Sequence, residues 1–443
     1  MAPRPPSGFT PSGTPYRPGG TKHPHAETFA TMLAAAGIET PEALDEALVA
    51  LGALEGGDEL SAFDPTAELV ALFQREAEAE MVEPAILLPA DLFLDTAGEE
   101  IRRRLFLTSD AEGAELCLRP DFTIPICRHY LEQGEAGREA ALGYFGPVFR
   151  QRPGESGEFL QAGIELFGNE DRAAADADVL ALAFQASALF AVEAPAVKMG
   201  DEGLFLALLD GLGLAPPLRR RLRGLFGTPE RLAATIRRLS DGTDGATAVR
   251  HAGLLGALAG SKPEEARQVV EDLLGLAGIA SVGGRSAHEI AERFLERAAI
   301  ASEGGLTPDA AAVLTRYLAI SASPERALDE LDAFQREVGI DMGEAIDLFA
   351  VRNDALRDCG IELDRPLFRA DFGRNLDYYT GFVFEMRDPD RDDDKPVIGG
   401  GRYDGLIERL GSPRPVAACG FSMWLDRLGI SGYGQELGEG ARP

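Results

Sequence analysis

The most informative stretch of this sequence is residues 144–168, which read YFGPVFRQRPGESGEFLQAGIELFG. Two apolar, aromatic-rich runs flank a polar segment at residues 152–158 that contains one Pro and two Gly. Because Pro and Gly between β-prone runs favour a reversing loop, the stretch predicts a β-hairpin.

Three polar side chains of this hairpin, Arg150, Gln161 and Glu165, stand among apolar neighbours. A polar group in such surroundings is costly unless it is hydrogen-bonded. Gln161 and Glu165 are four residues apart, so they share one face of a strand. From these residues alone two interpretations stay open: a salt-bridged antiparallel pair in a sheet, or a strand pair that carries a ligand.

Composition narrows the class of protein. A length of 443 residues allows two or three domains, and a hydrophobic content of 45% is that of an ordinary soluble protein. The formal net charge of −30 argues against a broad nucleic-acid surface, because phosphate neutralisation needs clustered Lys and Arg. It leaves room for a local basic pocket.

The four cysteines, Cys117, Cys127, Cys359 and Cys419, lack metal-ligand spacing and are too few for a disulfide framework. The five histidines do not cluster with them, so we expect no metal and no cofactor. No apolar run reaches the length of a membrane span, and the N-terminus has no signal-peptide core. The sequence therefore predicts a cytoplasmic protein with no membrane partner.

The N-terminal part divides into three predicted segments. Residues 1–25, rich in Pro, Gly, Ser and Thr, predict a disordered tail. Residues 26–62 have helical spacing and predict a helical extension. Residues 63–200 predict the first part of a mixed domain, with a helix from near Thr66. The Pro-punctuated segment 81–95 within it favours a sheet margin or a subunit contact.

The remaining chain also divides into three predicted segments. Residues 201–362 predict an inserted helical domain, because Thr228 and Ser323 each precede Pro and Glu and so mark helix starts with an N-cap hydroxyl. Residues 363–430 return to strand patterns and predict the second part of the mixed domain. Residues 431–443 are a tail.

A second polar cluster follows a predicted strand at residues 115–119. Asp121 and Thr123 stand at the tip of that strand and could bind a ligand. Taken singly, an ordinary helix-capping role is favoured for each.

Two further motifs follow the helical region, RNLDYYTGFVFE at residues 374–385 and GGGRYDGL at residues 399–406. Three consecutive Gly permit close approach of the backbone to a ligand or to another strand. The motifs together resemble the catalytic domain of class II aminoacyl-tRNA synthetases, and within them histidyl-tRNA synthetase, over roughly residues 66–200 and 365–430. The family's motifs match residues 118–123, Phe149-Arg150, 161–165, 374–379 and 400–406.

This resemblance implies an α+β fold: a class II aminoacyl-tRNA synthetase-like, six-stranded antiparallel sheet flanked by helices, with an inserted helical domain, that holds histidine in a pocket. Glu165 would pair with the amino group, Arg374 would face the carboxylate, and the tyrosines would frame the imidazole. The implied histidine-binding residues are Asp121, Thr123, Gln161, Glu165, Arg374, Tyr378, Tyr379 and Tyr403.

The sequence also departs from the synthetase pattern. The loop after Phe149 has lost the Glu that would meet adenine, and Glu155 and Glu158 would repel phosphates. Trp424, the only Trp of the chain, replaces a Gly of the last motif. Only sixteen residues follow Arg427, so we expect no anticodon-binding domain.

With these departures, the sequence resembles the family of ATP phosphoribosyltransferase regulatory subunits. The resemblance implies a subunit with no catalytic residues that dimerises with itself and forms a hetero-octamer with the short catalytic subunit. Free histidine would be its effector, and tRNA would not bind. Arg150, Trp424 and Arg427 would form an anion-binding or vestigial ATP site. The alternative is a truncated histidyl-tRNA synthetase-like enzyme that adenylates an amino acid, favoured by the presence of Arg150, Arg374 and Arg427.

Overall fold

The protein is described here by a computed structural model that covers residues 64–94, 96, 101–134, 136–241, 305–374, 376 and 378–430, with isolated residues at 268, 272, 281–282 and 285–286. The predicted tail at 1–25, the helical extension at 26–62, the C-terminal tail at 431–443 and most of 242–304 lie outside the described residues, as do Asn375 and Asp377.

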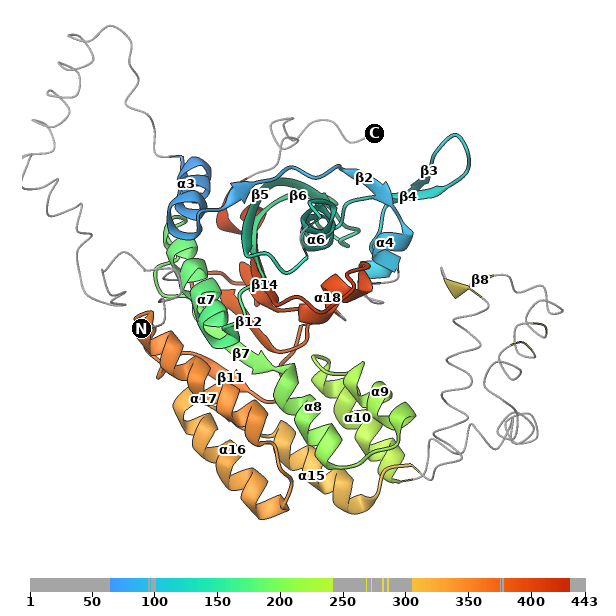
Figure 1. Ribbon diagram of the computed structural model, residues 1–443, viewed down its shortest axis with the longest axis vertical. Helices are drawn as coiled ribbons and strands as arrows, with labels where there is room; N and C mark the ends of the chain where they lie inside the picture. Colours follow the sequence, from blue (N-terminus) through green and yellow to red (C-terminus); the bar gives the residue numbers. More distant parts are fainter. Residues whose placement is uncertain are drawn as a thin grey trace, which may run out of the picture.

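The described part of the chain is built on a nine-stranded sheet with the order β1-β5-β6-β14-β13-β12-β7-β11-β10 (Figure 1). The six neighbouring strands from β5 to β7 are all antiparallel. The predicted six-stranded antiparallel sheet is thus confirmed, and three short strands extend it, with parallel pairing of β1 to β5 and of β11 to β7. The strands are β1 (Glu80–Met81), β5 (Ala140–Phe149), β6 (Glu158–Phe167), β7 (Ala196–Asp201), β10 (Ser321–Ala322), β11 (Leu367–Arg369), β12 (Phe382–Arg387), β13 (Ile398–Arg402) and β14 (Ala418–Trp424).

The predicted hairpin is formed by β5 and β6, which pair from Ala140 opposite Phe167 to Phe149 opposite Glu158. Gly154, in the loop between them, has φ +80°, a left-handed conformation that Gly adopts without steric cost. The Gly of the sequence pattern therefore marks the position where the backbone reverses.

Helices α3 (Pro65–Ala77), α7 (Arg172–Ala188) and α17 (Gly343–Asp358) cover one face of the sheet. Their apolar side chains pack on alternate strand residues, such as Ile164 of β6 and Phe421 of β14. Because strand side chains alternate between faces, Gln161 and Glu165 of β6 point to the other side. That second face is covered by α6 (Thr123–Glu132), α18 (Asp404–Arg409) and α4 (Asp91–Leu94).

A small sheet of order β2-β4-β3 flanks the second face; its strands are β2 (Leu87–Pro89), β3 (Leu107–Ser109) and β4 (Glu115–Leu118). The Pro-punctuated segment contains β2 and the last residue of β1, and both strands are at the edge of a sheet, as predicted. The helix predicted near Thr66 is α3, where the Asp64 side chain accepts from Thr66 N at 2.9 Å.

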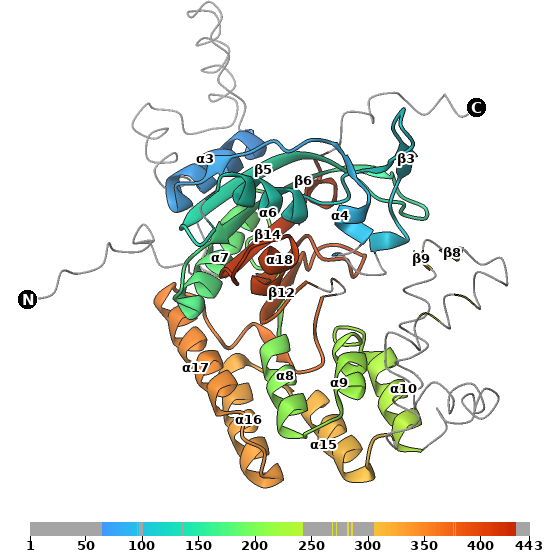
Figure 2. The same ribbon diagram turned by 45° about the vertical axis from the view of Figure 1, so that its right-hand side comes forward.

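Helices α8, α9, α10, α15 and α16 lie together below the large sheet (Figure 2). Their core contains Phe205, Leu314 and Phe334. Helices begin after Thr228 and Ser323 as predicted, but neither hydroxyl makes the cap hydrogen bond. The bounds are α8 (Glu202–Gly211), α9 (Pro216–Arg223), α10 (Pro229–Ser240), α15 (Pro308–Leu318), α16 (Pro324–Val338) and the short turn η1 (Leu425–Leu428), with an isolated strand pair β8 (Ser281–Val282) and β9 (Arg285–Ser286). The division of the chain into domains stays a prediction.

A buried ion-pair network joins helix α17 to the sheet. Arg352 of α17 donates to Asp176 of α7 at 3.3 Å and to Asp201 at the end of β7 at 2.5 Å. Arg402 of β13 donates to Asp176 at 2.9 Å. All four side chains are buried, so each charge depends on the others for its solvation. In the described part of the chain no helix is long and apolar enough to cross a bilayer.

Candidate functional site

The site is built around Glu165, whose side chain is buried on the second face of the sheet. One carboxyl oxygen accepts from Thr123 Oγ1 at 2.8 Å and from Tyr144 Oη at 3.2 Å. The other accepts from Tyr403 Oη. Burial raises the pKa of Glu165 to about 8, although these hydroxyl donors lower it. The protein alone therefore holds this carboxyl largely protonated at neutral pH.

Two glycines make room for this arrangement. Gly420 of β14 lies opposite Glu165, and a Cβ there would lie 1.9 Å from the Glu165 carboxyl oxygen. Gly163 lies opposite Tyr144, and a Cβ there would lie 2.4 Å from the Tyr144 hydroxyl. Gly420 therefore leaves space for the Glu165 carboxyl, and Gly163 leaves space for the Tyr144 hydroxyl that donates to it.

Tyr144 is a site residue that sequence reasoning missed, because a Tyr in an apolar strand resembles a core residue. Its hydroxyl contacts Glu165 and also Ser422 at 2.8 Å. The available signal was Gly163, which stands between Gln161 and Glu165 on the same strand face. A Gly at that position leaves space for a large neighbour from the next strand.

Three tyrosines form an aromatic wall beside Glu165. The ring centroids of Tyr378 and Tyr379 are 4.9 Å apart, and those of Tyr378 and Tyr403 are 5.9 Å apart. All three rings are buried, and burial raises the pKa of each phenol. The phenols therefore stay protonated and can donate or accept hydrogen bonds.

Two buried acceptors of the site have no hydrogen-bond partner among the described residues, Asp121 Oδ2 and Gln161 Oε1. Asp121 Oδ1 contacts Ile124 N at only 3.5 Å, so its helix-capping role is weak. A buried acceptor without a donor is rare in native proteins and needs an explanation. A ligand with several N–H donors would supply the missing partners.

Two arginines border the same region. Arg150 donates from Nε to Pro120 O at 2.6 Å; burial lowers its pKa, and the charge of Asp121 opposes that change. Arg374 donates to Phe384 O at 3.3 Å, and its Nε is buried without a partner among the described residues. Gly399 accommodates Arg374, since a Cβ there would lie 1.5 Å from its Nη1.

Trp424 is buried between two guanidinium groups. Its ring centroid lies 5.6 Å from Arg374 Cζ and 4.7 Å from Arg427 Cζ. The residue ends β14 and pairs with Gln161 of β6. The indole therefore fills space on the same strand face as Gln161.

The negative charge of Glu155, in the loop between β5 and β6, is compensated by neighbouring cations. Glu155 forms ion pairs with Arg152 at 3.2 Å and with Lys395. Arg152 also pairs with Asp426 at 2.9 Å. The charge of Glu155 is thus offset, which weakens the predicted repulsion of phosphates by this loop.

The structure brings the predicted residues together in two groups. Thr123, Glu165 and Tyr403 are joined by hydrogen bonds, and Tyr378 and Tyr379 pack beside them. Arg374 and Arg427 meet at Trp424. Their roles in ligand binding stay predictions. Among the described residues, no group of three His, Cys, Asp or Glu side chains could hold a metal ion.

The chain is similar in sequence to proteins of a known family. The family model for histidyl-tRNA synthetase matches residues 66–283 and 268–428. A relative from Chelativorans sp., named ATP phosphoribosyltransferase regulatory subunit, is 41% identical over 82% of this chain and 95% of its own length. A relative of the same name from Brucella ovis is 40% identical over 79% of this chain and 93% of its own length.

Solved structures share the fold. A crystal structure titled as an ATP phosphoribosyltransferase regulatory subunit/histidyl-tRNA synthetase from Bacillus halodurans matches with a TM-score of 0.54 and 21% identity, over 84% of this chain and 82% of that one. Histidyl-tRNA synthetase from a Nostoc species matches with a TM-score of 0.52 and 15% identity, over 84% and 74%. At these identities the likeness concerns the class II synthetase-like fold alone.

Proposed function

Because the chain belongs to the family of ATP phosphoribosyltransferase regulatory subunits and carries a histidyl-tRNA synthetase domain, we propose that it activates a short catalytic subunit of that transferase and conveys feedback inhibition by histidine. The observation that carries this proposal is the buried polar cluster around Glu165, in which Asp121 and Gln161 each have an acceptor without a partner among the described residues. A pocket selective for free histidine is what a feedback sensor needs, and a coupling of about 1–3 kcal/mol between two sites is typical of such regulation.

The contacts favour a revised orientation of the histidine. Both oxygens of Glu165 already accept from hydroxyl groups, whereas Asp121 Oδ2 and Gln161 Oε1 have no partner among the described residues. We therefore assign the ammonium to Asp121 and Gln161, and the imidazole to the tyrosine wall beside Glu165. Arg374 keeps its predicted place at the carboxylate, since its Nε has no partner among the described residues and can donate there.

Calorimetric titration with histidine tests this pocket. Asp121→Ala should weaken binding by about 1.5–3 kcal/mol, the usual range for a hydrogen bond to a charged group. Asp178→Asn is a matched control, because Asp178 is a carboxylate of α7 that contacts Cys359 on the opposite face of the sheet. Unchanged affinity in a folded Asp121→Ala protein would remove Asp121 from the site.

Partnership with the catalytic subunit is tested by mixing. We expect one complex by size-exclusion chromatography with light scattering, and higher transferase activity that histidine then suppresses. Two separate, unshifted peaks would contradict the assembly. The net charge of −30 supports the expectation that tRNA does not bind.

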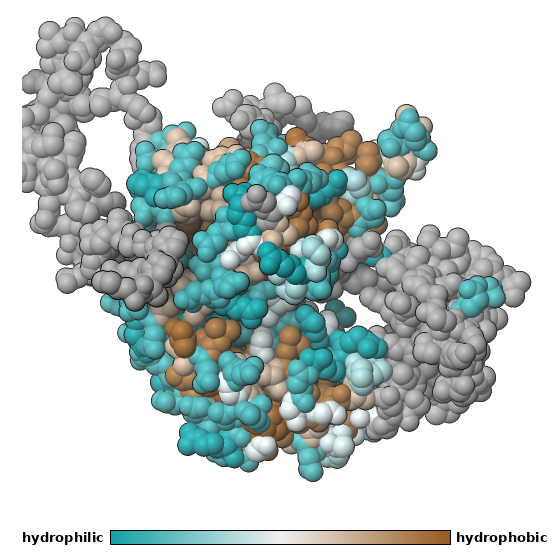
Figure 3. Space-filling model, in the orientation of Figure 1, coloured by the Kyte–Doolittle hydropathy of each residue, from teal (hydrophilic) through white to brown (hydrophobic). Residues whose placement is uncertain are grey.

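A self-dimer is supported by an apolar patch on the small sheet. Ile86, Leu87, Phe106 and Leu107 have exposed fractions of 41%, 47%, 36% and 51%. Apolar side chains gather over β2 in Figure 3. Burying such side chains in a subunit interface would stabilise a dimer. Leu87→Lys should therefore shift the protein toward monomer in light scattering.

The matched control for the dimer is Val351→Lys, because Val351 is 55% exposed on α17, away from the small sheet. This variant should remain a dimer. A Leu87→Lys protein that keeps the wild-type mass would show that the patch is not the interface.

The second candidate function, adenylation of an amino acid, is favoured by Arg150, Arg374 and Arg427. Trp424 opposes it, because its indole is close-packed between two of these arginines. We expect no histidine-dependent pyrophosphate exchange. Turnover clearly above a protein-free blank would overturn the regulatory proposal and favour the enzyme.

A further inference from the structure

The loop between α9 and α10 packs against the segment that carries Arg374. Phe226 of this loop lies over Gly373, where a Cβ would be 2.7 Å from the ring carbon Cδ1. Gly227 approaches the same residue, since a Cβ at Gly227 would be 2.7 Å from Gly373 C. Gly227 also has φ +80°, a left-handed conformation that favours Gly. The two glycines therefore allow the helical region to touch the residue that directly precedes Arg374.

Strand β7 contacts the same segment. A Cβ at Gly200 would lie 2.0 Å from Phe372 O and 3.0 Å from the ring carbon Cδ1 of Phe372. The Nζ of Lys198 lies 5.5 Å from the centroid of the Phe372 ring. The backbone that leads into Arg374 is thus close-packed on the large sheet and on the α9–α10 loop, and a shift of either would move it.

The position of Phe226 is set by the helical region. Its ring stacks on the buried ring of Phe205 in α8, with centroids 4.9 Å apart. Its backbone N donates to Arg223 O at 2.9 Å, and Thr228 N donates to Leu225 O at 3.0 Å, so the loop is hydrogen-bonded on both sides of Phe226. Phe226 is therefore a fixed contact that the helical region presents to Gly373.

Arg374 itself is held by weak contacts. Its Nη1 donates to Phe384 O at 3.3 Å, and its Nε has no partner among the described residues. Together with Phe226 and Tyr379 it lines a cavity of about 310 Å³. Loss of the Phe226 ring would widen this cavity beside the arginine. A guanidinium reads a carboxylate through directed N–H bonds, so its orientation decides the strength of the contact.

We propose that Phe226 is a positioning residue for Arg374, so that a loop of the helical region takes part in recognition of the histidine carboxylate. This inference rests on the proposed histidine site and extends it to a part of the chain in which the sequence indicates no site residue. Phe226 acts through Gly373 and touches no ligand itself.

Calorimetric titration with two ligands tests the proposal. Histidinol has a hydroxymethyl group in place of the carboxylate of histidine, so it makes no ionic contact with Arg374. Phe226→Ala in the full chain should weaken histidine binding at least fivefold and histidinol binding less than twofold. Arg374→Ala should show the same selectivity. Because the two residues act as a unit, the double variant should bind histidine no more weakly than Arg374→Ala alone.

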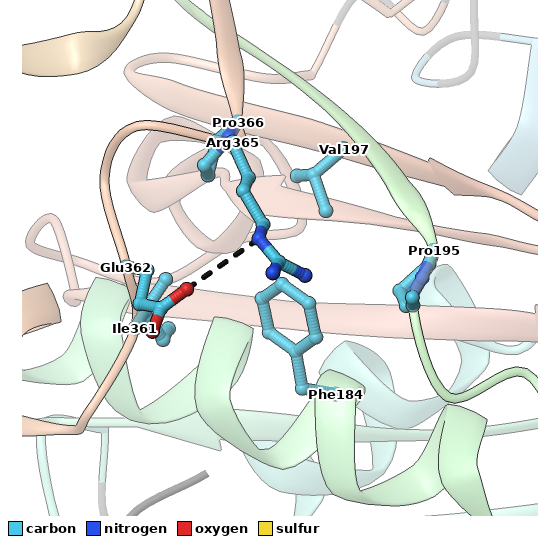
Figure 4. A pocket seen from close by; sticks show the side chains of 8 residues that line it. Phe184, Pro195, Val197, Ile361, Glu362, Arg365 and Pro366 are labelled. Carbon is cyan, nitrogen blue, oxygen red and sulfur yellow. Dashed lines mark ion pairs between the residues drawn. The ribbon is translucent and has the colours of Figure 1, made fainter. Parts of the chain in front are cut away.

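The matched control removes the same ring from a different cavity. Phe184 of α7 lines a cavity of about 50 Å³ together with Val197 and Pro366 (Figure 4). Phe184 and Val197 belong to the core on the face of the sheet opposite the histidine site. Phe184→Ala should change the affinities for histidine and histidinol by the same factor. If either Ala variant fails to fold by circular dichroism, the Leu variant at that position takes its place.

A second measurement needs no ligand. Trp424 is the only Trp, and its ring centroid lies 5.6 Å from Arg374 Cζ, so its fluorescence reports the position of that arginine. Phe226→Ala should change the emission of the free protein, and the change should vanish in an Arg374→Ala background.

Three results would overturn the proposal: an unchanged histidine affinity in Phe226→Ala, an equal loss for histidine and histidinol in that variant, or a fluorescence change that persists without Arg374. A wild-type protein that binds no histidine would instead overturn the proposed function. In that case the fluorescence of the free variants alone decides whether Phe226 positions Arg374.

Discussion

At the scale of single residues, the site around Glu165 depends on glycines, which leave room for its side chain. Gly420→Ala would place a methyl group 1.9 Å from the Glu165 carboxyl and 2.4 Å from Ile164 O. Since a neighbouring strand backbone cannot move aside cheaply, we expect a loss of about 1–3 kcal/mol in the free energy of unfolding, measured by urea denaturation. Histidine affinity should fall as well.

The matched control is Gly405→Ala in α18, where the added methyl meets only Thr380 Cγ2, at 3.3 Å. Helix propensity favours Ala there, so stability should be unchanged or slightly higher. Equal stability losses in the two variants would show that the contact with Glu165 is unimportant.

Trp424 gives a second prediction at this scale. If its indole occupies the place of adenine, Trp424→Gly should create ATP binding, whereas Trp424→Phe should not. Calorimetric titration with ATP measures both variants. Because Lys395 and Arg152 offset Glu155, we expect removal of the ring alone to suffice. Absence of ATP binding in Trp424→Gly would place the barrier elsewhere.

At the scale of elements, the sequence predicted several features that depend on local pattern, although the N-cap hydrogen bonds expected at Thr228 and Ser323 are absent. The β5–β6 hairpin, the start of α3 and the helix starts at Pro229 and Pro324 follow from neighbouring residues and are confirmed. The six-stranded sheet was predicted only through family resemblance, because its pairing joins distant segments. The two-residue strand β10 was not predicted, since nothing within a few residues of it indicates its partner. The contact of Tyr144 with Glu165 was missed, although Gly163 on the same strand face was a signal for it.

Helix α17 carries the third prediction. Arg352→Ala would leave Asp201 and Asp176 buried with fewer partners, so we expect the free energy of unfolding to fall by about 3–5 kcal/mol. Arg357→Ala on the same helix is the control, because Arg357 is exposed with its partner Glu325 and should cost less than about 1 kcal/mol. Thermal and urea unfolding of both variants measure the difference.

Similar losses for the two α17 variants would contradict a structural role for the buried network. A loss confined to Arg352→Ala would show that the network, rather than helix propensity, attaches α17 to the sheet.

At the scale of the whole molecule, buried carboxyl groups set the pH dependence of stability. Burial raises the pKa of Glu165 to about 8, of Glu202 to about 7 and of Asp178 to about 6. Between pH 4.5 and 8 the folded protein therefore binds more protons than the unfolded chain. The free energy of unfolding should fall as pH rises through this window, by about 2 kcal/mol or more.

Urea denaturation at several pH values, without histidine, measures this slope. Glu165→Gln should flatten it by up to about 1.4 kcal/mol per pH unit, the limit for one titrating group. A stability that rises from pH 5 to pH 8 would contradict the protonated state of these carboxyl groups.

The strand order has a consequence for synthesis on the ribosome. Strand β6 pairs with β14, yet β14 is among the last elements to be translated. At about 5–20 residues per second, the roughly 250 residues between them take on the order of 10–50 s to be made. During that interval the nascent chain presents an unpaired apolar strand edge, which is a template for aggregation. A chaperone, or helices α8, α9 and α10 as they emerge, would therefore have to shield β6 until Trp424 has left the exit tunnel.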